Sequence, residues 1–342
     1  MRLIITGGAG FIGSGFIRYI LQTRSDWQII NFDALTYAGN LENLSDVEDH
    51  PRYQFVRGSI DNHEQVRELV ARGADAIINF AAESHVDRSI MDAESFVQTN
   101  VVGTQILLDA ARKARNCRFI QISTDEVYGT LGPTGSFTET SPLAPNSPYA
   151  ASKAAADLLA RSYHATYGMA IVITRCCNNY GPYQFPEKLI PLMTLNAIQD
   201  SQLPLYGDGL YRRDWVHVVD HSRAIETILE NGQPGSVYNI GADHEETNLD
   251  LVQKILRILN KPDSLIELVR DRPGHDRRYA VDATKLRQEL GWAPIVPFEQ
   301  GLRETIEWYQ SSRSWVDRVT TGEYRSYYRR MYSQREKTLD EL

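Results

Sequence analysis

The chain has 342 residues, enough for one large domain or two domains of ordinary size. Hydrophobic residues make up 42% and charged residues 23%, so a sizeable core can form and general disorder is excluded. With 36 basic and 44 acidic side chains the net charge is −8, which argues against nucleic acid as a partner. No apolar run approaches the roughly 18 residues of a membrane span, and three cysteines do not make a disulfide framework. We therefore expect a protein of the reducing cytoplasm without a membrane partner.

Short apolar runs alternate with amphipathic stretches through the first half of the chain. Continuous β-branched runs predict strands buried on both faces, and the stretches between them predict helices. The expected strands are 2–6, 28–32, 53–57, 75–80, 118–123 and 170–174, with a late strand at 236–240. The expected helices include 12–22, 62–72 with Asp61 as its N-cap, and 148–167. This alternation predicts an α/β fold with a Rossmann-type doubly wound parallel sheet.

The composition changes near Asn178, where Gly and Pro become frequent. We expect residues 1–175, with a returning segment at about 214–241, to form the Rossmann-type domain. Residues 176–213 and 242–342 are expected to form a smaller C-terminal α/β domain that binds the substrate. The tail from Gly322 is rich in Tyr and Arg, but its mixed charges favour a solvated helix over a nucleic-acid-binding segment.

A glycine-rich loop follows the first expected strand and opens the first expected helix. Its glycines, Gly7, Gly10 and Gly13, allow backbone N–H groups to approach a pyrophosphate at the helix N-terminus. Asp33 follows the second strand 20 residues after Gly13, where an acid accepts hydrogen bonds from the adenosine ribose and repels a 2′-phosphate. No Arg or Lys follows in 34–40. The sequence therefore predicts a site for NAD rather than NADP, with a ligand-free glycine turn as the alternative.

Tyr149 and Lys153 are four residues apart in the expected helix 148–167, so they share one face of it. A lysine ammonium near a phenol lowers the phenol pKa and favours a phenolate. Such a phenolate can take the proton of a substrate hydroxyl next to a nicotinamide. A surface pair is the alternative, but the complete dinucleotide motif upstream favours catalysis.

Thr124, Asp125 and Glu126 stand at the carboxyl end of the expected strand 118–123. Ligands gather at that edge in open α/β sheets. Two adjacent carboxylates can act as general acid and general base if their surroundings separate their pKa values. A solvated acid pair is the alternative.

Nine segments together resemble the dTDP-glucose 4,6-dehydratases, a family of extended short-chain dehydrogenases/reductases, from Met1 to about Trp308. They are GGAGFIG, DALTYAGN, FAAESHVDRSI, ISTDEVYG, PNSPYAASK, NNYGPYQFPEKLIP, LYGDG, RDWVHVVDH and DRPGHDRRYA. The segment TDEVYG discriminates best. Sugar-nucleotide 4-epimerases of the same superfamily lack the Asp-Glu pair, and GDP-mannose 4,6-dehydratase keeps the Glu but differs in the preceding acid.

The resemblance implies dehydration of dTDP-glucose to dTDP-4-keto-6-deoxyglucose on tightly held NAD. It implies that Tyr149 takes the proton of the C4 hydroxyl while hydride leaves C4. Glu126 would then remove the C5 proton, and Asp125 would protonate the departing C6 hydroxyl before hydride returns to C6. Lys153 would tune Tyr149 and bind the nicotinamide ribose, and Thr124 would hold the C4 oxygen.

The resemblance also implies two sets of ligand contacts. Cofactor contacts are expected at Gly7, Gly10, Phe11, Ile12, Gly13, Asp33, Ala34, Leu35, Thr36, Ser59, Ile60, Phe80, Ala81, Ala82, Glu83, Ser84, Thr99, Tyr149, Lys153 and Asn179. Nucleotide-sugar contacts are expected at Ser84, Thr124, Asn178, Lys188, Leu189, Pro204, Leu205, Tyr206, Arg213, Asn248, Arg272, Pro273, Gly274 and His275. Guanidinium groups at Arg213 and Arg272 suit a diphosphate, although either could be a surface arginine.

One departure from the family is visible after the third strand. The family usually has Gly-Asp-Ile there, whereas this chain has Gly58-Ser59-Ile60, with Asp61 two positions beyond Ser59. We expect adenine recognition to rest on backbone groups of Ile60, and NAD to be held somewhat less tightly.

Histidines and cysteines elsewhere in the chain have weaker claims to a chemical role. His217 and His221 have the spacing of metal ligands but lack further ligands, so no metal site is expected. Cys176 and Cys177 are expected to be buried apolar residues, and His85 either orients a ligand or makes structural hydrogen bonds.

The helices near 93–113 and 148–167 carry more apolar residues than one buried stripe needs. With the resemblance, this implies a homodimer through a four-helix bundle. Three alternatives to the dTDP-glucose dehydratase stay open. They are an epimerase or decarboxylase on the same scaffold, a dehydratase of UDP-, CDP- or GDP-sugars, and a non-catalytic NAD-binding protein.

Overall fold

The computed structural model describes residues 1–114 and 117–340. Its centre is a seven-stranded sheet with the strand order β10-β6-β5-β4-β1-β2-β3, and all neighbouring strands are parallel. The strands are β1 (Arg2–Thr6), β2 (Gln28–Asp33), β3 (Tyr53–Arg57), β4 (Ala76–Asn79), β5 (Arg118–Thr124), β6 (Ile171–Cys176) and β10 (Val237–Ile240). The predicted doubly wound parallel sheet is confirmed, including its late strand.

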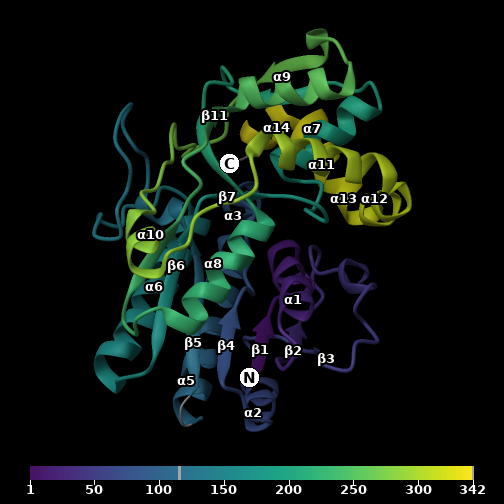
Figure 1. Ribbon diagram of the computed structural model, residues 1–342. Coiled ribbons are helices and arrows are strands. Elements are labelled where there is room, and N and C mark those ends of the chain that lie inside the picture. The colour runs from purple at the N-terminus through teal and green to yellow at the C-terminus, as the bar shows by residue number, and fades with distance from the viewer. Residues whose placement is uncertain (115–116, 341–342) are drawn as a thin grey trace.

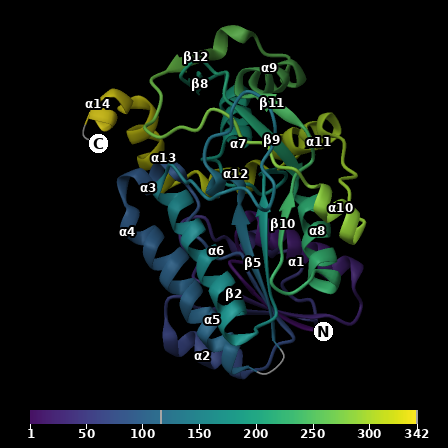
Figure 2. The same cartoon turned by 90° about the vertical axis from the view of Figure 1, so that its left-hand side faces the viewer.

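Helices cover both faces of this sheet because successive side chains of a buried strand point to opposite sides. Leu3 and Ile5 of β1 pack with α1 (Phe11–Thr23) and α8 (Val218–Asn231). Ile4 packs on the other face with α2 (His63–Ala71), α5 (Thr104–Lys113) and α6 (Pro148–Tyr167). Figure 2 shows the two helical layers with the sheet between them.

Local residues explain where two of these helices begin. The Ser147 hydroxyl accepts a hydrogen bond from the Ala150 N–H, Pro148 follows at the first helical position, and α6 ends at Gly168 with φ 65°. For α2 the predicted N-cap, Asp61, is wrong. The cap is Asn62, whose Oδ1 accepts from the N–H groups of the second and third helical residues. A side chain one residue earlier is too far from these N–H groups to cap them.

The expected helix over 93–113 is present, but it contains an irregular stretch. It begins as α4 (Ala93–Phe96), continues as the π-helical segment η2 (Val97–Gly103) and ends as α5. Such widened turns inside helices often stand at functional sites, and Thr99 and Asn100 lie in this one.

A smaller region lies above the end of the sheet that is away from the N-terminus (Figure 1). It contains the strands β7 (Asn178–Tyr180), β9 (Arg212–His217) and β11 (Glu245–Thr247), and the pair β8 (Leu203–Tyr206) and β12 (Ile266–Val269). Its core is formed with α7 (Leu189–Ile198), α9 (Asn248–Leu259) and α11 (Phe298–Ser311). The helix α10 (Thr284–Leu290) packs instead on the larger sheet, where Leu286 joins the core beside α8.

The tail forms the helices α12 (Arg313–Val319), α13 (Gly322–Tyr328) and α14 (Arg335–Asp340), with a π-helical turn η5 (Arg329–Ser333) between the last two. Tyr327, Met331 and Leu339 are buried. The tail is helical, as expected, but it is only partly solvated: one side is exposed, while its buried aromatic and apolar side chains pack on the body of the protein. No helix in the described ranges is both long and apolar enough to span a membrane.

Candidate active site

The turn between β1 and α1 has no room for side chains. A Cβ on Gly7, whose φ is 69°, would lie 2.6 Å from the backbone nitrogen of Ala81, and a Cβ on Gly13 would lie 2.3 Å from the Gly7 carbonyl oxygen. Gly10 caps α1 without a side chain, so the first N–H groups of this helix remain available. A backbone cradle at a positive helix end fits the pyrophosphate of a dinucleotide.

Asp33, the last residue of β2, lies beside this glycine turn. One of its carboxylate oxygens accepts a hydrogen bond from the Ala9 N–H at 2.9 Å, and the other accepts from the Leu35 N–H at 2.8 Å. Burial raises the pKa of Asp33, while these two N–H groups act in the opposite direction. The carboxylate is thus fixed in the cavity wall, where an adenosine ribose is expected.

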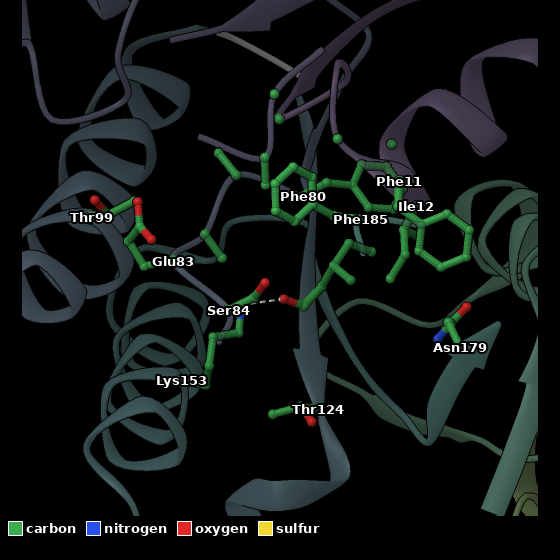
Figure 3. A pocket seen from close by; sticks show the side chains of 18 of the residues that line it. Phe11, Ile12, Phe80, Glu83, Ser84, Thr99, Thr124, Lys153, Asn179 and Phe185 are labelled. Atoms are coloured by element: carbon green, nitrogen blue, oxygen red, sulfur yellow. Dashed lines mark hydrogen bonds between the residues drawn. The ribbon is translucent and has the colours of Figure 1, made fainter. Parts of the chain in front are cut away.

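One cavity, here called the cofactor cavity, is lined by every expected cofactor contact except Leu35. Leu35 has a φ of 55° and contributes its backbone N–H to Asp33 instead. Figure 3 shows the rings of Phe11, Phe80 and Phe185 on one side of the cavity, with Lys153 and Thr124 on the other. Such apolar walls suit the flat rings of a dinucleotide.

Asn100 supports this cavity and was not expected from the sequence. Its side-chain oxygen accepts from the Glu83 N–H at 2.9 Å, and its amide group donates to the Glu83 carbonyl oxygen and to the Ser152 hydroxyl at 2.9 and 2.8 Å. The π-helical segment η2 thereby holds the loop 80–84 against α6. The contact crosses 17 residues of chain, so no local pattern could reveal it.

The carboxyl end of β5 presents the expected acid pair. The Thr124 hydroxyl accepts from the Glu126 N–H at 3.3 Å and starts the 3₁₀ turn η3 (Asp125–Tyr128). Asp125 is 1% exposed, and its Oδ2 has no hydrogen-bond partner among the described residues. Burial, and then the charge of Glu126, raise the pKa of Asp125 well above its ordinary value. Asp125 is therefore suited to act as a protonated acid.

Glu126 has different surroundings from its neighbour. Burial raises its pKa too, but the positive charges of Arg272, Arg213 and Lys188 act against this rise. These cations favour the carboxylate form of Glu126. The pKa values of the two acids are thus pushed apart in the direction that an acid–base pair needs.

Tyr149 and Lys153 both line the cofactor cavity from α6. Burial, and then the charge of Glu126, raise the pKa of Tyr149 well above its ordinary value, and a hydrogen bond with Thr124 lowers it. Lys153 Nζ donates to the Ile122 carbonyl oxygen at 2.6 Å, and burial lowers the Lys153 pKa. The expected lowering of the Tyr149 pKa by Lys153 is therefore wrong for this structure, because the ammonium is directed at a backbone oxygen.

A second cavity adjoins the cofactor cavity, and the two share Glu126, Asn178, Glu187 and Lys188. Of the expected nucleotide-sugar contacts, it is lined by Asn178, Lys188, Leu189, Pro204, Leu205, Tyr206, Arg213, Asn248, Arg272 and His275. Ser84 and Thr124 line the cofactor cavity instead. Pro273 and Gly274 line neither cavity; Gly274, with φ 65°, turns the loop between Arg272 and His275.

Buried polar groups of the second cavity lack protein partners. Arg213 is held by the carbonyl oxygens of Arg212 and Asp276 at 2.7 and 2.9 Å. Arg272 Nε and Asn248 Oδ1, however, are buried without a hydrogen-bond partner among the described residues. A buried polar atom is costly unless something satisfies it. The second cavity therefore suits a polar, phosphate-bearing ligand.

Three further residues of the second cavity were not expected from the sequence. Tyr332 of the tail lines it and lies 3.3 Å from the Tyr206 hydroxyl oxygen. The mixed charges of the tail are typical of a solvated helix, so they give no sign of this contact. Asp87 and Glu187 also line this cavity as buried acids.

Three histidines and the cysteines that the sequence singled out lie in buried positions. His85 lines the second cavity, with ring nitrogens near the Glu187 carbonyl oxygen and the Tyr327 hydroxyl. His217 caps α8 by accepting from the Val219 N–H at 3.4 Å, and His221 is fully buried. The three cysteines are free and buried. Within the described ranges no group of three or more His, Cys, Asp or Glu residues could hold a metal ion.

The chain is similar to known proteins along most of its length. The family model for GDP-mannose 4,6 dehydratase matches residues 4–305. The dTDP-glucose 4,6-dehydratase of Streptomyces niveus is 54% identical over 319 residues, which cover 92% of this chain and 94% of that protein. The dTDP-glucose 4,6-dehydratase 1 of Escherichia coli K12 is 47% identical, with coverage of 98% and 100%.

A solved structure agrees with these relatives. DesIV, a dTDP-glucose 4,6-dehydratase from Streptomyces venezuelae crystallised with NAD, is 51% identical and has a TM-score of 0.91, over 93% of this chain and all of that one. The fold and the cradle at the glycine turn define an extended short-chain dehydrogenase/reductase. Within that class the acid pair at the end of β5 separates dehydratases from epimerases. The chain belongs to the dTDP-glucose 4,6-dehydratase family.

Proposed function

We propose that the protein removes water from dTDP-glucose and forms dTDP-4-keto-6-deoxyglucose, with NAD as a cofactor that regains its starting redox state in each turnover. The observation that carries this proposal is the position of Glu126, in the wall shared by the cofactor cavity and the second cavity, beside the buried Asp125. An epimerase that only oxidises and reduces C4 has no use for such a pair. The identities of 54% and 47% to dTDP-glucose 4,6-dehydratases support the substrate.

The first chemical step would use the end of β5 and α6. Bound NAD supplies a hydride acceptor at C4 and later a hydride donor at C6. Tyr149 would take the proton of the C4 hydroxyl, and Thr124, whose hydrogen bond acts to lower the raised Tyr149 pKa, would hold the C4 oxygen. Lys153 lines the same cavity and would hold the nicotinamide ribose.

The elimination step would use the acid pair. The ketone at C4 acidifies the proton on C5, which Glu126 would remove as a carboxylate. The C5–C6 double bond forms as the C6–O bond breaks, and Asp125 would give its proton to the departing hydroxyl so that water leaves. Glu126 would then return its proton to C5 as hydride reaches C6, and the proton taken up by Tyr149 would pass through solvent to restore Asp125. The different surroundings of the two acids support these roles, since three cations oppose the rise in the Glu126 pKa, while burial and the charge of Glu126 raise the Asp125 pKa well above its ordinary value.

The substrate diphosphate would lie between Arg213 and Arg272 in the second cavity. We also propose the domain division 1–175 with 214–241, and 176–213 with 242–342. The placement of α8 and β10 on the larger sheet and of β7 and β11 in the smaller one supports it, whereas α10 packs on the larger sheet and β9 crosses the boundary at 214.

We further propose a homodimer in which α4–α5 and α6 meet the same helices of a second copy. These helices lie side by side on an outer face (Figure 2). Val97, Leu158 and Tyr167 on them are 50%, 53% and 52% exposed. Sedimentation should give the mass of a dimer, and Leu158→Glu should shift it toward the monomer. Three buried free thiols support a place in the reducing cytoplasm.

The deciding experiment compares dTDP-glucose with UDP-, CDP- and GDP-glucose as substrates of the purified protein. We expect the 4-keto-6-deoxy product, with the highest kcat/KM for dTDP-glucose. A C4 epimer as the product would favour the epimerase alternative. No product from any of the four would contradict the enzymatic proposal.

A further inference from the structure

One buried carboxylate joins two groups of the second cavity. Asp87 lies in α3 (Val86–Met91), three residues after Ser84, and is 3% exposed. Its Oδ1 accepts from Arg272 Nη1 at 2.5 Å, and its Oδ2 accepts from the Tyr206 hydroxyl at 2.8 Å. These partners lie 185 and 119 residues further along the chain. Both oxygens of Asp87 are thus used by side chains that line the cavity.

The contact with Asp87 orients the Arg272 guanidinium. Nη1 is occupied by the carboxylate, whereas Nε is buried and has no partner among the described residues. Guanidinium groups bind phosphate best through two N–H groups on one edge. The guanidinium is therefore held by Asp87 through Nη1, and its Nε–H group remains available to donate to an anion.

The second partner of Asp87 is held from two sides as well. The Arg335 guanidinium carbon lies 4.0 Å from the centre of the Tyr206 ring, and Arg335 itself donates to the Arg270 carbonyl oxygen at 2.6 Å. The Tyr206 hydroxyl is fixed by Asp87 and lies near the Tyr332 hydroxyl. Removing the Asp87 contact would leave the Tyr206 ring in place but free its polar end.

Asp87 is ionised in these surroundings. Burial alone would raise its pKa, but the charges of Arg272 and His85, with the hydrogen bonds from Arg272 and Tyr206, bring the pKa below its ordinary value. Hydrogen bonds to an ionised carboxylate are stronger than those to a neutral group, so Asp87 fixes Arg272 and the Tyr206 hydroxyl more firmly than a neutral side chain would.

We propose that Asp87 is a positioning residue for nucleotide-sugar binding, which fixes Arg272 for the substrate diphosphate and the polar end of Tyr206 from a single carboxylate. Both partners line the second cavity, and Asp87 holds them from α3, which follows the loop 80–84 of the cofactor cavity in the chain. This inference rests on the proposed function, because Arg272 and Tyr206 meet the nucleotide sugar only there. Asp87 acts through these side chains and takes no part in the chemistry.

The test uses Asp87→Asn in the full-length, NAD-loaded protein, with dTDP binding measured by calorimetry beside steady-state kinetics on dTDP-glucose. Loss of the charge-assisted contact should raise the Kd for dTDP and the KM for dTDP-glucose by roughly tenfold. The kcat at saturation and the NAD content should change by less than about threefold. A merely structural residue would instead lower the NAD content and kcat together, without a selective rise in the Kd for dTDP.

Two further variants keep the test decisive even if Asp87→Asn folds poorly, since it leaves Arg272 buried without its counter-charge. The double variant with Arg272→Gln has lost both charges, so no unpaired charge remains. Compared with the Arg272→Gln single variant, its loss of dTDP affinity should be at least about fivefold smaller than the loss that Asp87→Asn causes in the wild-type protein. Tyr206→Phe keeps the ring but removes the hydroxyl, and it should raise the KM with little change in kcat. The matched control is Asp200→Asn, which removes the carboxylate of a surface pair with Lys261 and should leave all values within about twofold.

The outcomes separate this inference from the function it rests on. An unchanged Kd for dTDP in Asp87→Asn, or an equal loss in the Arg272→Gln background, would overturn the positioning role. A wild-type protein that binds dTDP but does not convert dTDP-glucose would contradict the proposed function alone.

Discussion

The cofactor cavity and the second cavity are built in different ways. The cofactor cavity is made from short local pieces, namely the turn after β1, the end of β2 and the loop after β4, each directly at the carboxyl end of a strand. The second cavity takes its polar groups from α3, β9, the loop 270–275 and the tail, which are far apart in sequence. Backbone and small residues shape the phosphate end of the first cavity, whereas the polar groups of the second cavity are side chains held by other side chains.

Because of this difference, the two cavities should be sensitive to different kinds of substitution. Crowding of the backbone should damage the cofactor cavity, because its shape depends on missing side chains. Loss of a distant charge should damage the second cavity, because its groups are fixed by ion pairs such as Arg272 with Asp87. Four predictions test or sharpen this comparison.

The largest effect is expected at the wall that the two cavities share. Glu126→Gln should lower kcat by roughly 10³-fold, because it removes the base for C5. The step at C4 does not use this carboxylate, so reduced nicotinamide should accumulate and be visible by its absorbance. Glu230→Gln, which removes a surface partner of Arg24, is the control and should leave kcat unchanged. Full turnover by the Glu126 variant would contradict the assigned role.

The next effect tests the backbone cradle. Gly7→Ala should lower the free energy of unfolding by roughly 3 kcal/mol and cause loss of NAD, because the new Cβ meets the Ala81 backbone. Gly73→Ala has a similar positive φ of 80° but nothing within 4 Å, so it should cost only about 1 kcal/mol. Denaturant titration and the NAD content of the purified variants measure both. Equal losses would show that backbone conformation, rather than crowding, decides the effect.

A smaller effect should come from the helical layer behind the cofactor cavity. Burial lowers the pKa of His221 on α8 to about 3, so the unfolded chain binds this proton more readily than the folded one. Stability is therefore full above the unfolded pKa of about 6.5 and falls as the pH drops below it, by about 2 kcal/mol from His221 alone at about pH 5. His221→Leu should flatten the pH dependence of unfolding by that amount. The same slope in both proteins would disprove the assignment.

The smallest effect concerns the departure at Ser59, which lines the cofactor cavity. Ser59→Asp should slow the loss of NAD by roughly threefold, as expected from one added hydrogen bond to the adenine amine. Ser311→Asp adds the same charge on an exposed part of α11 and is the control. Dissociation of NAD followed by fluorescence measures the rate. An unchanged rate would show that Ser59 does not weaken NAD retention.

Much of the larger sheet follows from local pattern. The expected strands 2–6 and 53–57 and the helix 148–167 match β1, β3 and α6, because apolar runs, caps and glycine ends act over a few residues. The predicted cap of α2 is wrong by one residue. Asp61 and Asn62 are both good N-cap residues, and only the folded backbone shows which side chain reaches the first N–H groups. Most of the expected ligand residues line one of the two cavities, and Leu35, Pro273 and Gly274 do not, since they shape loops through their backbone.

The tail shows where local pattern fails. Its charges are mixed, which is typical of a solvated helix, yet Tyr327 packs edge-on against His85 and Tyr332 reaches the second cavity. The surface that buries these rings comes from segments more than a hundred residues away. Composition cannot reveal such a surface.

Local pattern is enough to specify the alternation of strands and helices, the glycine cradle, the acid after β2 and the acid pair at the end of β5. These features depend on chain geometry over a few residues, which the order of side chains specifies directly. The tertiary structure was needed to place Glu126 between two cavities, to bury Asp125 so that its pKa rises, and to direct Lys153 at the Ile122 carbonyl oxygen rather than at Tyr149. It also placed Asp87 between Arg272 and Tyr206. Burial and the charges of distant segments set these properties, and both exist only once the chain has folded.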